Sequence, residues 1–522
     1  MTLQNDAMRL DTPSASEAGR GTQRLALLAL ALGPLFLAAW QMKPLYADNQ
    51  NTKYLHALAN AGFGQLGGDW LARTKDGLPL FTWLLEALYR GFGPGAFYAA
   101  TLVSFTIFLF CALLIYDLIA KPRNIPPYGL AIFLAVLFAL AAATDLQQLV
   151  FSGFAEQYIL GGYFQTADFG VLLLAAIVLF VKRQLALAMP CIIVGAAMHP
   201  GYVVPGAMLL AIFTLYEAAH FDDAGRAAKI ARLAICALGL AILMAISMAL
   251  KGLFTPTDAQ TQLEAHRILT DVRIPRHASL WVWLNQNVFI QFGLCLAAAL
   301  LLPPGRLRFV IRLGLGAMAI FVLAAFLPHT ETYRLIAPWR ISVIMVPLAS
   351  LSLCAVAIVR LYEAGRFGGA RPARIMAVSA GVVLLCAAVG AGFTAAKFLK
   401  PAPAYESFVT ANLAPGQHYL TGPSRSEFRL ATGAPQYITF KSHPYQDVEV
   451  LEWLRRLRAA QALYAGDAMD CAQLQRVARE DAVTHVLVTG KTPAVACPFA
   501  AEIFSDGGAK IFRLEREKMA TP

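Results

Sequence analysis

The stretch AFYAATLVSFTIFLFCALLIYDLIA, residues 96–120, decides the fold class, because it carries a single charge, at Asp117, among mostly apolar side chains. The roughly 30 Å hydrocarbon core of a bilayer needs about 20 such residues in a helix. Ten further apolar runs are bounded by charge, proline or glycine, and together they predict an α-helical polytopic membrane protein. The eleven predicted spans are 24–43, 96–120, 127–145, 167–182, 184–198, 201–219, 230–250, 286–303, 308–327, 337–359 and 374–396.

Composition agrees with this class. Of 522 residues, 58% are hydrophobic and only 14% are charged, and the mean hydropathy is +0.57. Soluble domains carry about 25% charged residues. This composition excludes an ordinary cytosolic enzyme, a disordered protein and a nucleic-acid binder. Six of the eight cysteines lie inside the apolar runs, where cysteine usually acts as a small buried hydrophobic residue.

The distribution of Lys and Arg predicts the topology, because cytoplasmic loops are enriched in them. With the leader 1–23 in the cytoplasm, the inward connections carry many basic residues, whereas the outward loops 146–166 and 199–200 carry none. The first span lacks a small-residue cleavage site, so we interpret it as a retained anchor. An odd number of spans places the C-terminus outside. We therefore expect a multi-pass protein of the inner membrane, whose net charge of +11 largely reflects topology.

Three regions follow from these patterns: the leader, a transmembrane domain over 24–400 with a large first outer loop at 44–95, and an extracytoplasmic α/β domain over 401–522. Cys471 and Cys497 are the only cysteines of that last domain, where they either form a disulfide or remain two free thiols. The expected elements of this domain are strands near 417–421, 436–440 and 484–489, a hairpin of 501–504 with 509–514, and helices over 447–464 and 471–480.

The first outer loop is too long for a simple connector, and long loops in compact proteins are usually functional. Asp48 stands directly after the first span and before a short helix expected at 51–61. A carboxylate held at the membrane surface is suited to act as a general base toward an acceptor hydroxyl. The alternative is that Asp48 caps the helix beginning at Asn51, a role that aspartate fills well.

The residues of this loop also carry a family resemblance. The run Asp48…Tyr54…Ala59…Gly68-Asp69-Trp70-Leu71…Pro79…Trp83-Leu84…Gly91-Phe92-Gly93 resembles the first extracytoplasmic loop of GT-C-type glycosyltransferases. The likeness is to lipid-linked-sugar transferases such as the aminoarabinose and protein mannosyl transferases. In those enzymes an acidic residue just after the first span is the catalytic base.

The resemblance implies Asp48 as the base, Asp69 as the next catalytic candidate, and Tyr54 and Trp70 as substrate-binding residues. The expected architecture is similar as well, with about eleven spans, a large first loop and an outer C-terminal domain. The family often has Asp-Glu where this chain has Asp48-Asn49-Gln50, which leaves one carboxylate. This departure argues against a metal-assisted version of the reaction, so we assign no metal ligands, although a divalent metal stays open as an alternative. We predict no other cofactor.

A polyprenyl-phosphate donor would bring a phosphate to the outer interface, where arginine is suited to bidentate contact. The candidates are Arg334 and Arg340, between the ninth and tenth spans, and Arg273 and Arg276, in the loop 251–285. For Arg340 the alternative is a side chain that snorkels to the headgroups.

Polar residues in other outward segments are candidates for substrate contact. Glu156 and Tyr163 lie in the loop 146–166, which would look the same if it were merely solvated. His199 and His329 stand between spans, and for His199 a polar turn residue is the alternative. Asp168 enters a span, where an ionisable group is costly and often functional. The cluster Lys441–Tyr445 in the outer domain suits either an acceptor site or a solvated surface.

The leading interpretation is an inverting membrane glycosyltransferase that moves a sugar from a polyprenyl-phosphate-linked donor to an acceptor on the outer face. Its partners would be the lipid-linked donor and membrane lipid, without nucleic acid. One alternative is a transporter or flippase, which predicts charged or broken helices at mid-membrane in repeated halves. Another is a non-catalytic assembly protein for envelope polysaccharide. The sequence specifies neither the sugar nor the acceptor nor the oligomeric state.

Overall fold

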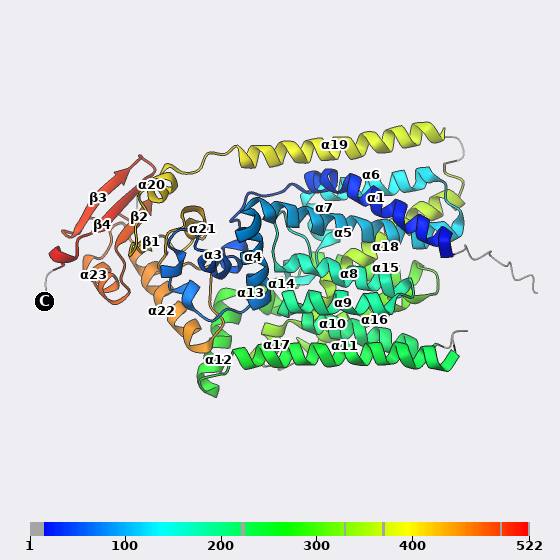
Figure 1. Ribbon diagram of the computed structural model, residues 1–522, viewed down its shortest axis with the longest axis horizontal. Coiled ribbons are helices and arrows are strands. Elements are labelled where there is room, and N and C mark those ends of the chain that lie inside the picture. Colours follow the sequence, from blue (N-terminus) through cyan, green and yellow to red (C-terminus); the bar gives the residue numbers. More distant parts are fainter. Residues whose placement is uncertain (1–14, 221–224, 328–329, 368–370, 491–492, 520–522) are drawn as a thin grey trace, which may run out of the picture.

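The computed structural model describes residues 15–220, 225–327, 330–367, 371–490 and 493–519. Long helices run side by side in a bundle, and a smaller region with a β-sheet stands at one end of it (Figure 1). We refer to this end as the domain end and to the other as the far end.

All eleven predicted spans are helices, as expected. Seven helices in the described residues are long and apolar enough to cross a membrane. In addition, α6 (Pro127–Ala142) and the short helix α7 (Thr144–Phe151) form a pair bent by 109°. Three others are shorter than a full span. The eleven are α1 (Ala15–Trp40), α5 (Gly95–Ala120), α6 (Pro127–Ala142), α8 (Gly170–Val181), α9 (Leu185–Met198), α10 (Val203–Ala219), α11 (Gly225–Leu253), α15 (Gln286–Leu301), α16 (Arg306–Ala324), α18 (Ser342–Glu363) and α19 (Pro372–Phe398).

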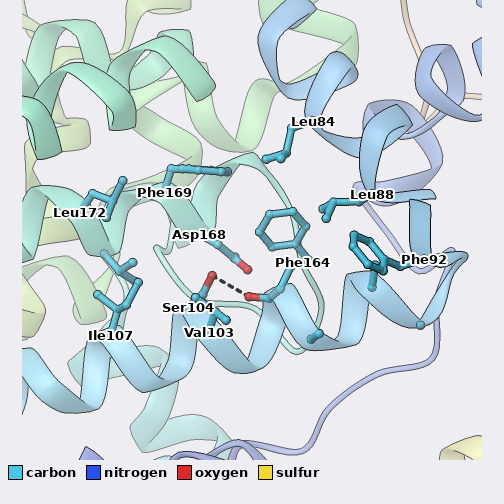
Figure 2. A pocket seen from close by; sticks show the side chains of 15 residues that line it. Leu84, Leu88, Phe92, Val103, Ser104, Ile107, Phe164, Asp168, Phe169 and Leu172 are labelled. Atoms are coloured by element: carbon cyan, nitrogen blue, oxygen red, sulfur yellow. Dashed lines mark hydrogen bonds between the residues drawn. The ribbon is translucent and has the colours of Figure 1, made fainter. Parts of the chain in front are cut away.

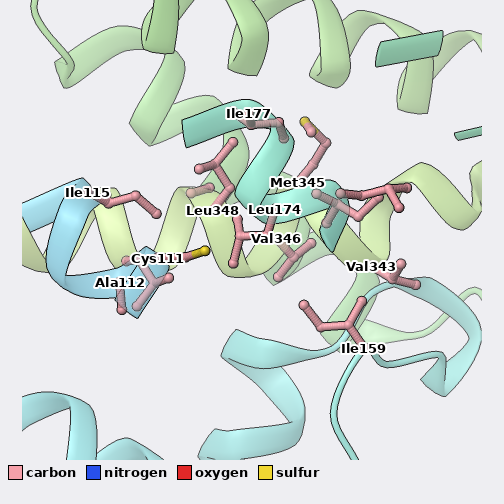
Figure 3. Close-up of a cluster of buried hydrophobic side chains, with 14 of the residues drawn as sticks. Cys111, Ala112, Ile115, Ile159, Leu174, Ile177, Val343, Met345, Val346 and Leu348 are labelled. Carbon is pink, nitrogen blue, oxygen red and sulfur yellow. The ribbon is translucent and has the colours of Figure 1, made fainter. Parts of the chain in front are cut away.

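Helix α18 carries apolar side chains on all of its faces, and most of them are buried. A helix with this pattern packs in the interior, so α18 lies at the centre of the bundle. Cys111 and Ile115 of α5, Leu174 of α8 and Leu348 of α18 meet in one apolar cluster (Figure 3). Helices α11 and α19 instead leave most of their apolar side chains exposed, as expected of helices that face lipid.

An ion cluster closes the far end. The buried carboxylate of Glu217 on α10 lies 2.6 Å from Nε of Arg232 on α11 and 3.0 Å from Nη2 of Arg306 on α16. The Arg306 guanidinium also lies over the rings of Phe180 and Tyr216. A buried charge is tolerated when it is paired in this way. The cluster joins three helices at the end that the Lys and Arg pattern assigns to the cytoplasm.

The C-terminal region has an α/β fold, as expected. Its sheet has the order β1-β2-β4-β3, with β1 parallel to β2 and the other pairs antiparallel. Cys471 and Cys497 form a disulfide with their Cα atoms 5.4 Å apart. The elements are β1 (Tyr419–Leu420), β2 (His485–Thr489), β3 (Ala500–Ser505), β4 (Ala509–Leu514), α20 (Ala404–Asn412), α21 (Phe428–Thr432), α22 (Asp447–Tyr464) and α23 (Cys471–Glu480).

The strand expected at 436–440 is wrong. Only Gln436 pairs with the sheet, through one bridge to Tyr419. The chain then leaves the sheet, because the Phe440 N–H donates to the carbonyl of Pro423 and the Ser442 hydroxyl donates to the carbonyl of Asn51 in the first loop. A tertiary contact thus replaces strand pairing here, and this departure carries Lys441 toward the membrane domain.

The first loop and the segment 251–285 pack against the C-terminal region. Thr257 N–H donates to a carboxylate oxygen of Asp447 at 2.7 Å, and the Thr52 hydroxyl donates to the carbonyl of Lys441. These segments therefore share the domain end, as the predicted alternation of loops requires. The first loop contains α2 (Gln50–Lys53), α3 (Leu55–Asn60) and α4 (Pro79–Phe92), and the second segment contains α12 (Ala259–Arg267), the π-helix η7 (Ile268–Arg273), α13 (Pro275–Ala278) and α14 (Leu280–Trp283).

Candidate active site

A cavity of about 460 Å³ with a mostly polar lining opens at the domain end. We call it the polar cavity. Four of the residues predicted from the sequence line it, namely Asp48, Glu156, Tyr163 and Arg276. Its other charged lining residues are Lys43 and Lys397.

The bend between α6 and α7 shapes one wall of the polar cavity. Ala143 has an extended backbone there, and the following segment folds back through a bridge between Ser152 and Tyr158. Gly153 allows a close approach to α18, because a Cβ at this position would lie 2.4 Å from the backbone nitrogen of Val343. The loop 146–166 is therefore packed into the bundle, and the solvated-loop alternative does not describe it.

Asp48 has a left-handed backbone, with φ of 50°, and does not cap α2. Its two carboxylate oxygens face two ammonium groups, Lys43 Nζ at 3.3 Å from Oδ2 and Lys441 Nζ at 3.4 Å from Oδ1. Burial acts to raise the pKa of Asp48, but Lys441 and Lys43 outweigh it and hold the pKa below its ordinary value. The carboxylate is therefore ionised at neutral pH.

Lys43, Lys397 and Lys441 were not predicted as parts of this site. Lys43 and Lys397 each stand at the end of an apolar run that reaches the domain end of the bundle. Their position at the end of a predicted span could therefore have identified them. Lys441 comes from the C-terminal region, 393 residues from Asp48. The cluster Lys441–Tyr445 had stood out in the sequence, yet the pattern gave no indication that it reaches Asp48.

Asp69, the next catalytic candidate from the sequence, is fully buried and lines neither the polar cavity nor the apolar groove described below. It accepts hydrogen bonds from the backbone N–H groups of Leu71 and Gln436, each at 2.9 Å, and pairs with buried Arg429 at 3.5 Å. These contacts join the first loop to the C-terminal region. Asp69 is therefore a structural residue.

Tyr54 and Trp70, both expected to bind substrate, also lie outside the lining of the polar cavity. Tyr54 is buried in the core of the first loop, where its hydroxyl donates to the carbonyl of Phe164 at 2.7 Å. The Trp70 ring lies against the guanidinium of Arg456, 4.6 Å from its centroid, at the contact with the C-terminal region.

Of the four candidate arginines, Arg276 alone lines the polar cavity, where its exposed guanidinium lies 4.0 Å from the carboxylate of Glu156. Arg334 lies elsewhere and is paired with Asp271 at 2.6 Å and Glu331 at 2.8 Å. Arg273 uses its guanidinium to hold the carbonyl of Lys441, and burial lowers its pKa to about 10. Both arginines are thus committed to contacts within the protein.

Arg340 points into the protein and does not snorkel. Its Nε donates to Gln157 Oε1 at 2.8 Å, and its guanidinium lies so close to Gly201 that a Cβ there would be 1.8 Å from Nη1. His199 forms the polar turn beside it, accepting the Gly201 N–H at Nδ1. Neither Arg340 nor His199 lines the polar cavity. His329 lies outside the described residues.

A second cavity, of about 680 Å³, is lined by α4, α5 and the start of α8 (Figure 2). We call it the apolar groove. Phe92 and Val103 of its lining are 79% and 58% exposed, so the groove opens on the outer surface of the protein. Asp168, which is 1% exposed, also lines it, and neither of its carboxylate oxygens has a hydrogen-bond partner in the described structure.

The two cavities share one wall. Residues 160–163 line the polar cavity, and Phe164, Asp168 and Phe169 line the apolar groove. Among the described residues, no group of three or more His, Cys, Asp and Glu side chains is placed to hold a metal ion. The arrangement offers the carboxylates of Asp48 and Glu156, several cations and a neighbouring apolar groove.

Comparison with known proteins returned one family and a set of solved structures. Residues 404–460 match the model of a family described as "Domain of unknown function (DUF6798)". No curated protein matches the chain. The structure of ArnT from Cupriavidus metallidurans bound to undecaprenyl phosphate is similar over 98% of this chain and 100% of its own, with 14% identity and a TM-score of 0.48. The apo structure of the same ArnT gives 12% identity, the same coverage and a TM-score of 0.48.

Proposed function

We propose that this protein is a GT-C-type membrane glycosyltransferase that transfers a sugar from a polyprenyl-phosphate-linked donor to an acceptor on the outer face of the inner membrane. The observation that carries the proposal is the ionised Asp48 in a cation-rich polar cavity, with the lipid-facing apolar groove on the other side of one shared wall. The domain end would then face the outside of the cell.

In the proposed reaction the acceptor oxygen attacks the anomeric carbon of the donor sugar. The bond between that carbon and the phosphate oxygen breaks, and its electron pair stays on the phosphate. Asp48 takes the proton of the acceptor hydroxyl as general base. One displacement of this kind inverts the anomeric configuration and requires only one carboxylate at the acceptor.

The charges around Asp48 suit the leaving group. The donor phosphate carries one negative charge and gains a second when the sugar leaves. Lys43, Arg276 and Lys397 line the polar cavity against the carboxylates of Asp48 and Glu156, which leaves an excess of positive charge. Cations placed where negative charge develops stabilise the transition state.

The apolar groove suits the lipid part of the donor. Almost all of its lining side chains are apolar, and it is open toward the hydrocarbon region beside α4 and α5. Drawing a polyprenyl tail into water costs about 0.8 kcal/mol for each CH₂ that becomes exposed. A groove that holds the first isoprene units beside the polar cavity lets the phosphate reach Asp48 while the tail remains in lipid.

The test is sugar transfer by membranes that contain the wild-type chain or Asp48→Asn, with an undecaprenyl-phosphate-linked sugar as donor and release of undecaprenyl phosphate as the readout. General-base catalysis contributes about 10²–10⁴-fold, so we expect a loss of that size in Asp48→Asn. Glu86→Gln is the matched control, since Glu86 pairs with Arg90 one turn along α4 and does not line the polar cavity. Transfer by Asp48→Asn at the wild-type rate would contradict the assignment of the base, and translocation of an unconsumed donor would favour the flippase.

A further inference from the structure

We propose that Lys43 and Lys441 bind the donor phosphate, and that Asp48 is the counterion that both lysines exchange for it. The inference rests on the proposed function and names the phosphate ligands and the order of events at the same site. It also gives the C-terminal region a role in binding the donor, because Lys441 belongs to this region. Lys441 lies within residues 404–460, which match the domain of unknown function.

The contacts of Asp48 with Lys43 and Lys441 are long and accessible enough for a phosphate to replace the carboxylate. Each carboxylate oxygen faces one ammonium group, at 3.3 Å for Lys43 and 3.4 Å for Lys441. Charge-assisted hydrogen bonds between nitrogen and oxygen are usually about 2.7–2.9 Å long. The side chain of Asp48 is 50% exposed, and those of Lys43 and Lys441 are 43% and 30% exposed. All three are therefore accessible to an incoming anion.

The backbone of Lys441 is held firmly, although its side chain is not. Arg273 donates to its carbonyl through Nε, at 3.1 Å, and through Nη2, and the Thr52 hydroxyl donates to the same oxygen at 3.1 Å. The next residue, Ser442, is bonded to the carbonyl of Asn51. These contacts from η7 and α2 place the lysine stem beside Asp48 while the ammonium group can still turn.

Lys43 is placed in the same way from the other side. Its backbone N–H donates to the carbonyl of Gly162 at 2.7 Å, and its ammonium group lies 5.4 Å from the centre of the Tyr163 ring. Both lysines thus reach Asp48 from anchored backbone segments, one at each carboxylate oxygen.

Three of the four arginines expected to bind phosphate are not free to do so. Arg334 is paired with two carboxylates, Arg273 supports Lys441, and Arg340 donates from Nε to Gln157 Oε1 at 2.8 Å. A lysine ammonium group has three donors on a flexible stem, so it can turn from a carboxylate to a phosphate without backbone movement. The two lysines are therefore better placed than these arginines to receive the anion.

The exchange sets an order of events. Contact with the two ammonium groups holds the pKa of Asp48 low and makes it a weak base. Bound phosphate draws both cations away and adds a negative charge nearby, and each change raises the affinity of Asp48 for a proton. The base therefore becomes effective only once the donor is in place.

The test is binding of undecaprenyl phosphate to the purified full-length protein, with undecaprenol as the uncharged probe. We expect Lys441→Gln and Lys43→Gln each to weaken binding of the phosphate by about tenfold, the effect of about 1.4 kcal/mol, and to leave undecaprenol unaffected. Lys441→Arg should retain most of the affinity. Asp48→Asn should bind the phosphate severalfold more tightly than the wild type, because it removes the competing carboxylate.

The matched control is Lys510→Gln, which removes an exposed lysine of the same region that pairs with Glu502. Unchanged phosphate binding in both Lys441→Gln and Lys43→Gln, or weaker binding in Asp48→Asn, overturns the exchange and leaves the proposed function standing. A wild-type protein that does not distinguish undecaprenyl phosphate from undecaprenol contradicts the proposed function as well. Binding of undecaprenol by each variant shows that it is folded.

Discussion

Asp69 and Arg429 form an ion pair of 3.5 Å in which both side chains are completely buried, and the pair joins the first loop to the C-terminal region. Breaking a buried pair on one side costs about 3–5 kcal/mol, because the remaining charge is left without a partner. We expect Asp69→Asn to lower the unfolding free energy by about that amount, measured by thermal or denaturant unfolding in detergent.

The control for Asp69→Asn is Glu502→Gln, which removes one partner of an exposed pair with Lys510 and should change stability by less than about 1 kcal/mol. The fraction of Asp69→Asn that remains folded should retain the wild-type affinity for undecaprenyl phosphate. A stable Asp69→Asn protein without transfer activity would instead return Asp69 to the list of catalytic candidates.

Two glycines of α19 provide a matched pair for the packing of the bundle. A Cβ at Gly390 would lie 2.1 Å from the carbonyl oxygen of Ala38 on α1, whereas nothing lies within 4 Å of one at Gly392. Backbone atoms cannot move aside as a side chain can, so Gly390→Ala should destabilise the protein by about 1–3 kcal/mol. Gly392→Ala should stabilise it by up to about 1 kcal/mol through helix propensity. Equal melting temperatures for the two variants would contradict the close contact of α1 and α19.

The pH dependence of transfer should report the ion pairs of Asp48. Its pKa lies below the ordinary value of 3.8, so the carboxylate remains a base as the pH falls from 7 to that value. The profile of kcat/KM, which reports the free enzyme, should therefore show no acid limb from Asp48 between pH 7 and 5. In Lys441→Gln one cation is lost and the acid limb should move to higher pH. Identical acid limbs in both proteins would show that Lys441 does not act on Asp48.

The disulfide between Cys471 and Cys497 closes a loop with a sequence separation of 26. Loop closure of this length contributes about 3 kcal/mol. Reduction, or replacement of both cysteines by serine, should lower the melting temperature of the C-terminal region without altering the polar cavity, which the disulfide does not touch. Near-unchanged melting with and without a reductant would show that other contacts dominate the stability of this region.

The proposed orientation places residues after Lys400 outside the cell. A reporter that is active only after export should be active when fused there, and a reporter that is active only in the cytoplasm should be silent. Fusions after Arg183, in the α8–α9 turn at the far end, should give the opposite pattern. Cytoplasmic activity after Lys400 would contradict both the orientation and the proposed outer active site.

The sequence by itself determined those features that depend on neighbouring residues. The eleven apolar helices, α22 over Asp447–Tyr464 and the hairpin of β3 and β4 follow from local periodicity and turn residues, and the structure confirms them. The position of Asp48 directly after the first span also indicated a candidate general base. Each of these patterns is contained in a short window, where helix and strand periods can be read directly.

The partners of the charged side chains, in contrast, follow from the tertiary structure alone. Asp48 and Asp69 are both aspartates of the first loop, yet one faces a cavity between two lysines and the other is buried against Arg429. Lys441 reaches Asp48 across 393 residues because the chain leaves the sheet after Gln436. The partners of a charged side chain depend on how distant segments pack, and no local pattern contains that information. The same packing fixed Arg334 in ion pairs and left Arg276 facing the polar cavity.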